Sequence, residues 1–149
     1  MSDIIEYTST DFIKIVESED KFGVIEELAS LFSEGDVCTD IKALIAALKD
    51  RERIMSTGIG FGIAIPHAKI EQVKNISFAV GISKKGVEFD SMDGKPVHLI
   101  ILVAAGDKQH KHYLSLMSNI MTVLKNDEIK EKIIDSTDKV EILRLLGSC

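Results

Sequence analysis

The sequence predicts an α/β domain in which helices cover a mostly buried sheet. Two nearly continuous apolar runs, residues 76–82 and 97–104, have the composition of strands that are covered on both faces. Apolar residues recur at helical spacing before and after these runs, so helices and strands interleave along the chain. The chain has 149 residues, of which 45% are hydrophobic, and this suits one substantial core. We therefore expect a single layered domain over residues 1–149.

The N-terminal third predicts a short strand and two helices. Residues 1–10 form a polar lead that we expect to be poorly ordered, and the β-branched segment 12–16 predicts the first strand. The polar residues 18–20 predict the start of a helix that ends at Gly35, with an apolar face made of Phe22, Ile25, Leu28, Ala29 and Phe32. Thr39 is a candidate N-cap for the second helix, whose apolar face comprises Ile41, Leu44, Ile45 and Leu48.

The residue pattern changes at Ser56, where helical spacing of apolar residues gives way to a glycine-rich segment. Glycines at alternate positions predict a loop, and this loop leads into a short apolar strand, residues 63–65. Pro66 closes that strand, which we expect to stop just before His67. A turn-rich segment, residues 86–96, separates the two long strands.

The C-terminal third predicts helices. One apolar stripe consists of Leu114, Met117, Ile120, Met121 and Leu124, and a second consists of Ile129, Ile133 and Ile134. Residues 140–146 predict a last helix, which Gly147 ends.

Composition and charge exclude several classes of protein. The longest apolar runs fall well short of the roughly 18 residues that a membrane-spanning helix needs. The first residues contain early acids and no basic flank, so we expect no secretory signal and a cytoplasmic protein. A formal net charge of −6 disfavours nucleic acid as a partner. Cys38 and Cys149 show no spacing motif, and we interpret both as free thiols.

His67 is the first candidate for a functional residue. It follows a strand and a proline at the end of a glycine-rich loop, and α/β domains tend to bind ligands beyond the ends of their strands. Pro66 has a fixed φ and pushes Ile65 towards extended geometry, so the imidazole is presented from a stiff backbone. A strand-end histidine without a function is an equally good interpretation at this point, because histidine is common in both settings.

The glycines and the other histidines permit two interpretations each. Backbone amides of the glycine loop can approach an anion closely, but the loop lacks the lysine and hydroxyl of a Walker motif, and a tight turn explains the glycines as well. His98 lies inside an apolar strand pattern, which is typical of a satisfied, half-buried histidine. His110 and His112 invite a metal site. However, positions two apart on a helix diverge by about 200°, so we expect no metal and no cofactor.

The residues around His67 also resemble a known family. Arg51 and Glu52, followed by residues 56–69 (STGIGFGIAIPHAK), closely resemble the active-site signature of the mannitol/fructose-class IIA domains of the bacterial phosphoenolpyruvate-dependent sugar phosphotransferase system. Segments 86–90 and 93–97 and the strand that ends at residues 104–105 resemble the next block of that family. The resemblance covers nearly all of the chain from about residue 12, and its nitrogen-regulatory relatives share the same signature.

The resemblance implies a phosphocarrier. The family fold is a mixed sheet, of about five strands, flanked by helices. The histidine that His67 matches takes a phosphoryl group from the phosphohistidine of HPr, or of its nitrogen-branch counterpart, and passes it to a IIB domain. Arg51 is implied to neutralise the phosphoryl group. Uncharged donors at the phosphate are then expected from Thr57 and from the amides of Gly58, Gly60 and Gly62, while Lys69 either adds charge or is simply exposed.

One position departs from the family pattern. The family commonly has a second active-site histidine at the start of the helix that follows the last strand. The register without gaps places Tyr113 there, and His112 is one residue earlier. Three alternatives follow: His112 takes the role, Tyr113 replaces the histidine, or His110 reaches in from the loop.

The resemblance leaves the role of the chain open. A IIA phosphocarrier for a fructose- or mannitol-like sugar would pass the group to a IIB component. A nitrogen-branch regulatory protein would instead use phosphorylation of His67 to control binding to target proteins. A binding module without phosphotransfer is a third alternative, and the presence of both Arg51 and His67 disfavours it.

Overall fold

The computed structural model describes residues 4–33 and 36–148. The α-helices of this part of the chain are α1 (Lys21–Ala29), α2 (Ile41–Ile54), α3 (His110–Leu124), α4 (Asp127–Asp135) and α5 (Lys139–Leu146). Short 3-10 helices are η1 (Ile4–Tyr7), η2 (Thr10–Phe12) and η3 (Ser30–Ser33). The strands are β1 (Ile13–Ile15), β2 (Gly58–Gly60), β3 (Ile63–Ala64), β4 (His67–Lys69), β5 (Ser77–Val87) and β6 (Val97–Ala105).

These strands form one mixed sheet. The order is β1-β5-β6-β3-β2, and β4 pairs with β6 beyond the end of β3. The central pair, β5 and β6, is antiparallel, whereas β1 runs parallel to β5, and both β3 and β4 run parallel to β6. The predicted mixed sheet flanked by helices is confirmed. It has six strands rather than about five.

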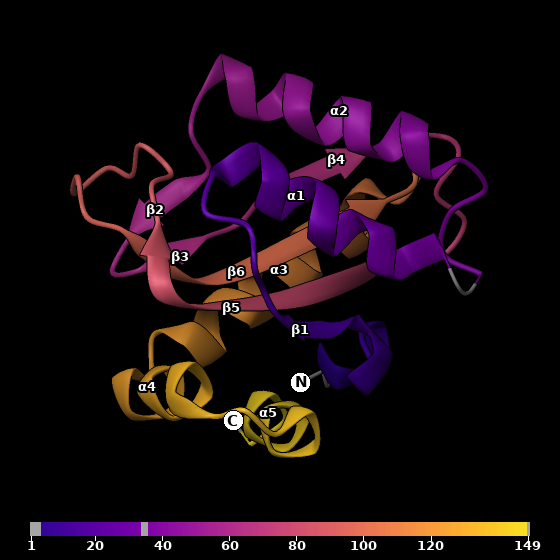
Figure 1. Cartoon of the computed structure of the whole chain (residues 1–149). Helices are drawn as coiled ribbons and strands as arrows, with labels where there is room; N and C mark the ends of the chain where they lie inside the picture. The colour runs from indigo at the N-terminus through magenta and orange to yellow at the C-terminus, as the bar shows by residue number, and fades with distance from the viewer. Residues whose placement is uncertain (1–3, 34–35, 149) are drawn as a thin grey trace.

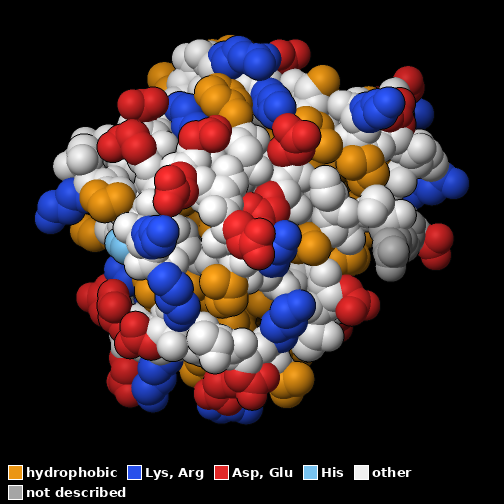
Figure 2. Space-filling model, viewed as in Figure 1, with side chains coloured by type: hydrophobic (Ala, Val, Ile, Leu, Met, Phe, Trp, Pro, Cys, Tyr) orange, Lys and Arg blue, Asp and Glu red, His pale blue; other side chains and the backbone are white. Residues whose placement is uncertain are grey.

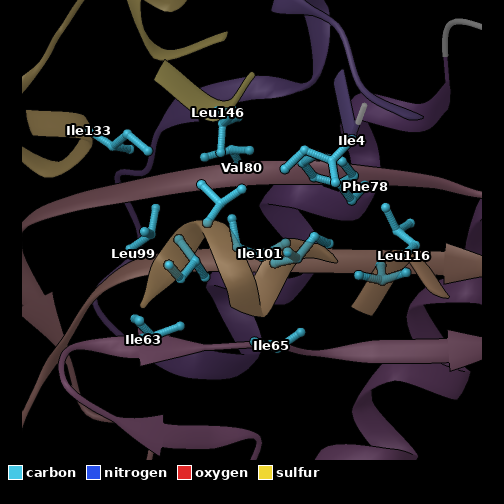
Figure 3. Close-up of a cluster of buried hydrophobic side chains, with 14 of the residues drawn as sticks. Ile4, Ile63, Ile65, Phe78, Val80, Leu99, Ile101, Leu116, Ile133 and Leu146 are labelled. Atoms are coloured by element: carbon cyan, nitrogen blue, oxygen red, sulfur yellow. The ribbon is translucent and has the colours of Figure 1, made fainter. Parts of the chain in front are cut away.

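The sheet is covered on both faces, as Figure 1 shows with α1 and α2 on one side and α4 and α5 on the other. Alternate residues of β6 face opposite layers. Leu99, Ile101 and Val103 pack with residues of α3, α4 and α5, and Figure 3 shows the first two among this cluster. Ile100 and Leu102 pack with residues of α1 and α2. Burial on both faces is the reason that the two long strands are almost continuously apolar in the sequence.

Two predictions about the N-terminal third concern its lead and the start of its second helix. The predicted lead spans residues 1–10, of which residues 1–3 lie outside the described part; Ile4–Tyr7 form η1, which packs against α3 and α5, and Ile4 is only 3% exposed. The prediction of Thr39 as the N-cap of α2 is wrong. The N-cap of α2 is Asp40, whose Oδ1 accepts a hydrogen bond from Ala43 N at 3.1 Å, while Thr39 Oγ1 donates to Gln72 O. The predicted helix end at Gly35 lies outside the described residues, and α1 passes into η3 at Ser30.

The helix after β6 is rotated relative to the predicted stripe. Leu114, which was expected on the apolar face, is 52% exposed, and Tyr113 and Leu116 are buried in its place. Met117 and Met121 are only partly buried at the edge of the core. The predicted stripe therefore mixes residues of the core with methionines that line a cavity. For this reason the predicted buried face of α3 is displaced by one residue from the observed one.

The surface carries charges of both signs. In the view of Figure 2, lysine and arginine side chains are interspersed with aspartate and glutamate side chains, and apolar side chains are scattered between them. No helix in the described part of the chain is both long enough and apolar enough to span a membrane. Cys38 is a half-buried free thiol, as predicted, whereas Cys149 lies outside the described residues.

Candidate functional site

His67 is the first residue of a strand. The short strand predicted to stop before His67 is present as β3, which ends at Ala64. A further strand that was not predicted, β4, begins at His67 and pairs with β6 at Val103. Pro66 lies between β3 and β4 and interrupts the backbone pairing with β6, because proline has no N–H to donate. Its carbonyl nevertheless accepts a hydrogen bond from Val103 N at 2.9 Å, so pairing resumes at once. The backbone that carries the imidazole is thereby anchored to β6.

The orientation of the His67 ring is set by a backbone carbonyl. Nδ1 lies 2.9 Å from Ile65 O. A carbonyl oxygen only accepts, so Nδ1 carries the hydrogen and the neutral ring keeps its free lone pair on Nε2. Burial lowers the pKa of His67 below its ordinary value, and the nearby positive charges of Arg51 and Lys69 act in the same direction. The ring is therefore neutral at neutral pH, with its lone pair on Nε2.

Arg51 lies in the last turn of α2 and is held by the end of its own helix. Its Nη1 donates to Met55 O at 2.8 Å. Burial raises the pKa of Tyr113, and the positive charge of Arg51 partly opposes this rise. Arg51 and His67 line the same cavity. The remaining N–H groups of Arg51 form the planar set of donors that suits phosphate oxygens.

His67 and Arg51 line one cavity of about 710 Å³. Most of its wall is apolar, and three cations, Arg51, Lys125 and Lys130, contribute to it. The apolar lining is Met55, Ile59, Phe61, Ile63, Ile65, Met92, Met117, Met121 and Leu124. Methionine side chains are flexible and adapt to different surfaces, so this cavity suits contact with more than one macromolecular partner.

Tyr113 is the helix residue that faces His67. Their ring centroids are 5.7 Å apart, and Tyr113 is 8% exposed. The ring of His110 stacks on the other side of Tyr113 at 6.2 Å, and Lys69 Nζ lies 4.6 Å from the Tyr113 ring and 2.9 Å from His110 Nδ1. His112 is exposed, because one step along a helix rotates a side chain by about 100°. Of the three alternatives for the auxiliary position, the geometry thus brings Tyr113 to the nucleophile.

The predicted donors of the glycine loop are engaged within the protein. Thr57 donates from both N and Oγ1 to Glu52, and Gly58 N donates to Ser56 Oγ at 3.0 Å. Gly60 and Gly62 have positive φ values of 95° and 76° and flank Phe61, which itself has a φ of 58°. A side chain is strongly disfavoured in this conformation, so these two glycines serve a tight turn. The expectation that Thr57 and Gly58 present free donors to a phosphate therefore does not agree with the structure.

Sequence reasoning missed two contributors to the site. The sequence includes Glu52 in the signature but predicts no role for it, whereas the structure shows it buried and bonded to the turn beside Arg51. Its position was detectable, because residue 52 lies four after Leu48 and continues the buried stripe of α2. Lys130 of α4 is also buried and donates to Phe61 O at 3.1 Å. No pattern in the sequence links it to a turn so far away along the chain.

The remaining histidines have other environments. His98 is half-buried, and its Nδ1 lies 2.9 Å from Ser83 O, which confirms the prediction of a satisfied strand histidine. Within residues 4–33 and 36–148, no group of three or more His, Cys, Asp or Glu side chains is arranged to hold a metal ion.

The site combines a neutral imidazole and an arginine at an apolar cavity, and such groups suit the positioning and charge stabilisation that phosphoryl transfer needs. Residues 6–149 match the model of the family described as phosphoenolpyruvate-dependent sugar phosphotransferase system, EIIA 2. The chain belongs to this family.

Three relatives illustrate the range of the family. The chain is 34% identical to a fructose-specific EIIA component of Haloferax volcanii, over 99% of this chain and 96% of that protein. It is 35% identical to a fructose-specific EIIABC component of Bacillus subtilis over 97% of its own length, but it spans only 23% of that protein. The crystal structure of nitrogen regulatory protein IIA-Ntr from Neisseria meningitidis superimposes with a TM-score of 0.88 and 27% identity, covering 96% of this chain and 98% of that one.

Proposed function

We propose that this chain is a phosphocarrier that accepts a phosphoryl group on Nε2 of His67. The donor is phosphorylated HPr or its nitrogen-branch counterpart, and the acceptor is a IIB component of a fructose- or mannitol-like uptake system. The observation that carries the proposal is the hydrogen bond from Nδ1 to Ile65 O, which leaves Nε2 as the nucleophile. The proposal requires the chain to share the cytoplasm with these partners.

The transfer step exchanges one N–P bond for another. The lone pair of His67 Nε2 attacks phosphorus while the N–P bond to the donor histidine breaks, and the donor ring leaves with that electron pair. His67 keeps its Nδ1 hydrogen, so the step needs no general base. Catalysis of this reaction depends on in-line positioning and on stabilising charge, which are the tasks proposed for Arg51 and for the Tyr113 hydroxyl. In passage to the acceptor, a nucleophile of the IIB component attacks phosphorus while the N–P bond to His67 breaks, and the electron pair of that bond returns to Nε2.

Similarity to relatives supports the choice of acceptor and also a second candidate. The name of the Bacillus subtilis relative joins A, B and C parts in one protein, which supports a IIB component as the acceptor. The likeness to the nitrogen regulatory protein, over nearly the whole chain, supports a regulatory role in which phosphorylation of His67 controls binding to target proteins. Both candidates use the same histidine.

The proposal is tested by incubating the protein with enzyme I, HPr and labelled phosphoenolpyruvate. We expect one acid-labile phosphate per chain on Nε2 of His67, identified by ¹⁵N and ³¹P NMR. His67→Gln should take no label, and the matched control His98→Gln, which changes a strand histidine bonded to Ser83, should take it normally. Label on the His67→Gln protein would overturn the proposal. Transfer onward to a IIB component, measured in the same assay, separates the transport role from the regulatory one.

A further inference from the structure

Glu52 is a buried carboxylate that no step of the proposed reaction uses. It follows Arg51 on α2, but its side chain is fully buried beneath the turn that leads from α2 to β2. Oε2 accepts a hydrogen bond from Thr57 N at 2.9 Å, and Oε1 accepts one from Thr57 Oγ1 at 2.6 Å. Lys21 Nζ of α1 lies 3.7 Å from Oε2. Burying a charge is costly unless such partners are present, so a carboxylate kept at this position calls for a reason.

A chain of hydrogen bonds leads from Glu52 to the nucleophile. Glu52 fixes Thr57, and the carbonyl of Thr57 accepts from Ile65 N at 3.0 Å. The carbonyl of the same Ile65 accepts from His67 Nδ1 at 2.9 Å. Two peptide units therefore connect the carboxylate to the ring, and each one sets the direction of the next.

The same turn also holds the arginine. Met55, two residues before Thr57, provides the carbonyl to which Arg51 Nη1 donates at 2.8 Å. The segment between Met55 and Thr57 is short, so a displacement of Thr57 moves this carbonyl as well. Both functional groups of the site are oriented by main-chain carbonyls whose positions depend on the bond between Glu52 and Thr57.

We infer that Glu52 is the positioning residue of this site: through Thr57 it aligns the carbonyls that orient the His67 imidazole and the Arg51 guanidinium. The inference rests on the proposed function, and it assigns a role to a residue that does not itself contact the phosphoryl group. It also accounts for Thr57, whose two donors serve Glu52 instead of the phosphate.

Two substitutions of Glu52 distinguish the effect of its side-chain length from the effect of its charge. Glu52→Gln keeps the length of the side chain, so its carbonyl can accept from Thr57 N and its amide can donate to Thr57 Oγ1 after the hydroxyl rotates. Glu52→Asp keeps the charge but is one methylene shorter, and its carboxylate cannot reach both donors without moving the turn. A positioning role predicts that Gln is tolerated better than Asp, whereas a role of the charge alone predicts the opposite order.

The first readout is the rate at which each variant takes phosphate from HPr. We expect Glu52→Gln to stay within about tenfold of the wild-type rate, since both hydrogen bonds to Thr57 are kept and only lose their charge. Glu52→Asp should fall by on the order of 100-fold, the effect expected from misplacing a reacting group by about 1 Å. The matched control is Glu27→Asp. Glu27 of α1 accepts hydrogen bonds from Glu17 N and Ser18 N, remote from the cavity, and this variant should transfer normally.

The second readout is the tautomer of His67, measured by ¹⁵N NMR of the ring nitrogens. Wild type, Glu52→Gln and Glu27→Asp should hold the hydrogen on Nδ1, while Glu52→Asp should lose this preference because Ile65 O is no longer aligned. A merely structural role would lower stability without changing the tautomer. Glu52→Asp with a wild-type rate and a wild-type tautomer, or with a faster rate than Glu52→Gln, would overturn the inference. The tautomer is measured without a phosphate donor, so failure of the wild-type protein to take label would count against the proposed function alone.

Discussion

The tip of the turn between β2 and β3 offers a test that separates stability from activity. Two substitutions there should differ in stability but slow phosphate transfer equally. Phe61 occupies this tip with a φ of 58°, and its side chain is 77% exposed. Its N–H donates to Asp93 Oδ2 and its carbonyl accepts from Lys130 Nζ, so both backbone groups are held in place. An exposed aromatic ring held in an unfavourable backbone conformation at the edge of the cavity is the feature expected of a residue that contacts a partner.

The magnitudes follow from these contacts. A positive φ costs a residue with a side chain about 1–2 kcal/mol, and glycine avoids this cost but adds about 0.5–1 kcal/mol of unfolded-state entropy. The Nζ of buried Lys130 lies 5.9 Å from the exposed Phe61 ring, a cation–π contact worth about 0.5–1 kcal/mol. Both Phe61→Gly and Phe61→Ala lose it. Phe61→Gly should therefore be more stable than Phe61→Ala by about 1 kcal/mol, which is about 2–4 °C in Tm.

Urea unfolding gives the stability difference, and phosphate transfer from HPr gives the activity. Both variants should be slower than wild type by a similar factor, because both remove the ring from the cavity wall. Val140→Ala, which shortens an apolar side chain that is 67% exposed on α5, should transfer normally. Equal stability of the Gly and Ala variants would refute the argument from backbone strain. Wild-type transfer by either variant would refute the contact with a partner.

Two further predictions concern the groups beside His67. Tyr113→Phe should slow transfer by about tenfold, which is the effect of removing one hydrogen bond to a charged group, whereas His112→Ala should not slow it. The labelled-phosphate assay measures both rates. Equal rates for the two variants would contradict the role of Tyr113. The pKa of His67 is lowered chiefly by burial, so the folded state binds fewer protons than the unfolded state. The free energy of unfolding should therefore fall as the pH drops below about 6.5, and it should fall less in His67→Gln. The measurement is the free energy of unfolding of both proteins at pH 7.5 and 5.5. The same pH dependence in both proteins would contradict this prediction.

Much of the fold could be predicted from the sequence, because burial produces a regular spacing of apolar residues in strands and helices. The strands at 76–82 and 97–104 were predicted correctly, since residues covered on both faces are apolar without interruption. The predicted helices at the ends of the chain are present as α1, α2 and α5. Some of the wrong predictions concern choices between adjacent residues, such as Asp40 in place of Thr39 at the start of α2. Both side chains can cap a helix, and only the competing bond of Thr39 to Gln72 O decides between them.

The sequence by itself pointed to His67 and Arg51 as the candidate pair and to the family, because Arg51 and the segment 56–69 form a long and specific local pattern. It also determined the layered α/β architecture. Only the tertiary structure decided which residue of α3 faces His67, since a rotation of about 100° per residue separates Tyr113 from His112 and depends on how the whole helix packs. It alone also showed that Thr57 serves Glu52. Hydrogen bonds between groups close in space but separated by a turn depend on the direction of each side chain, which the order of residues does not specify.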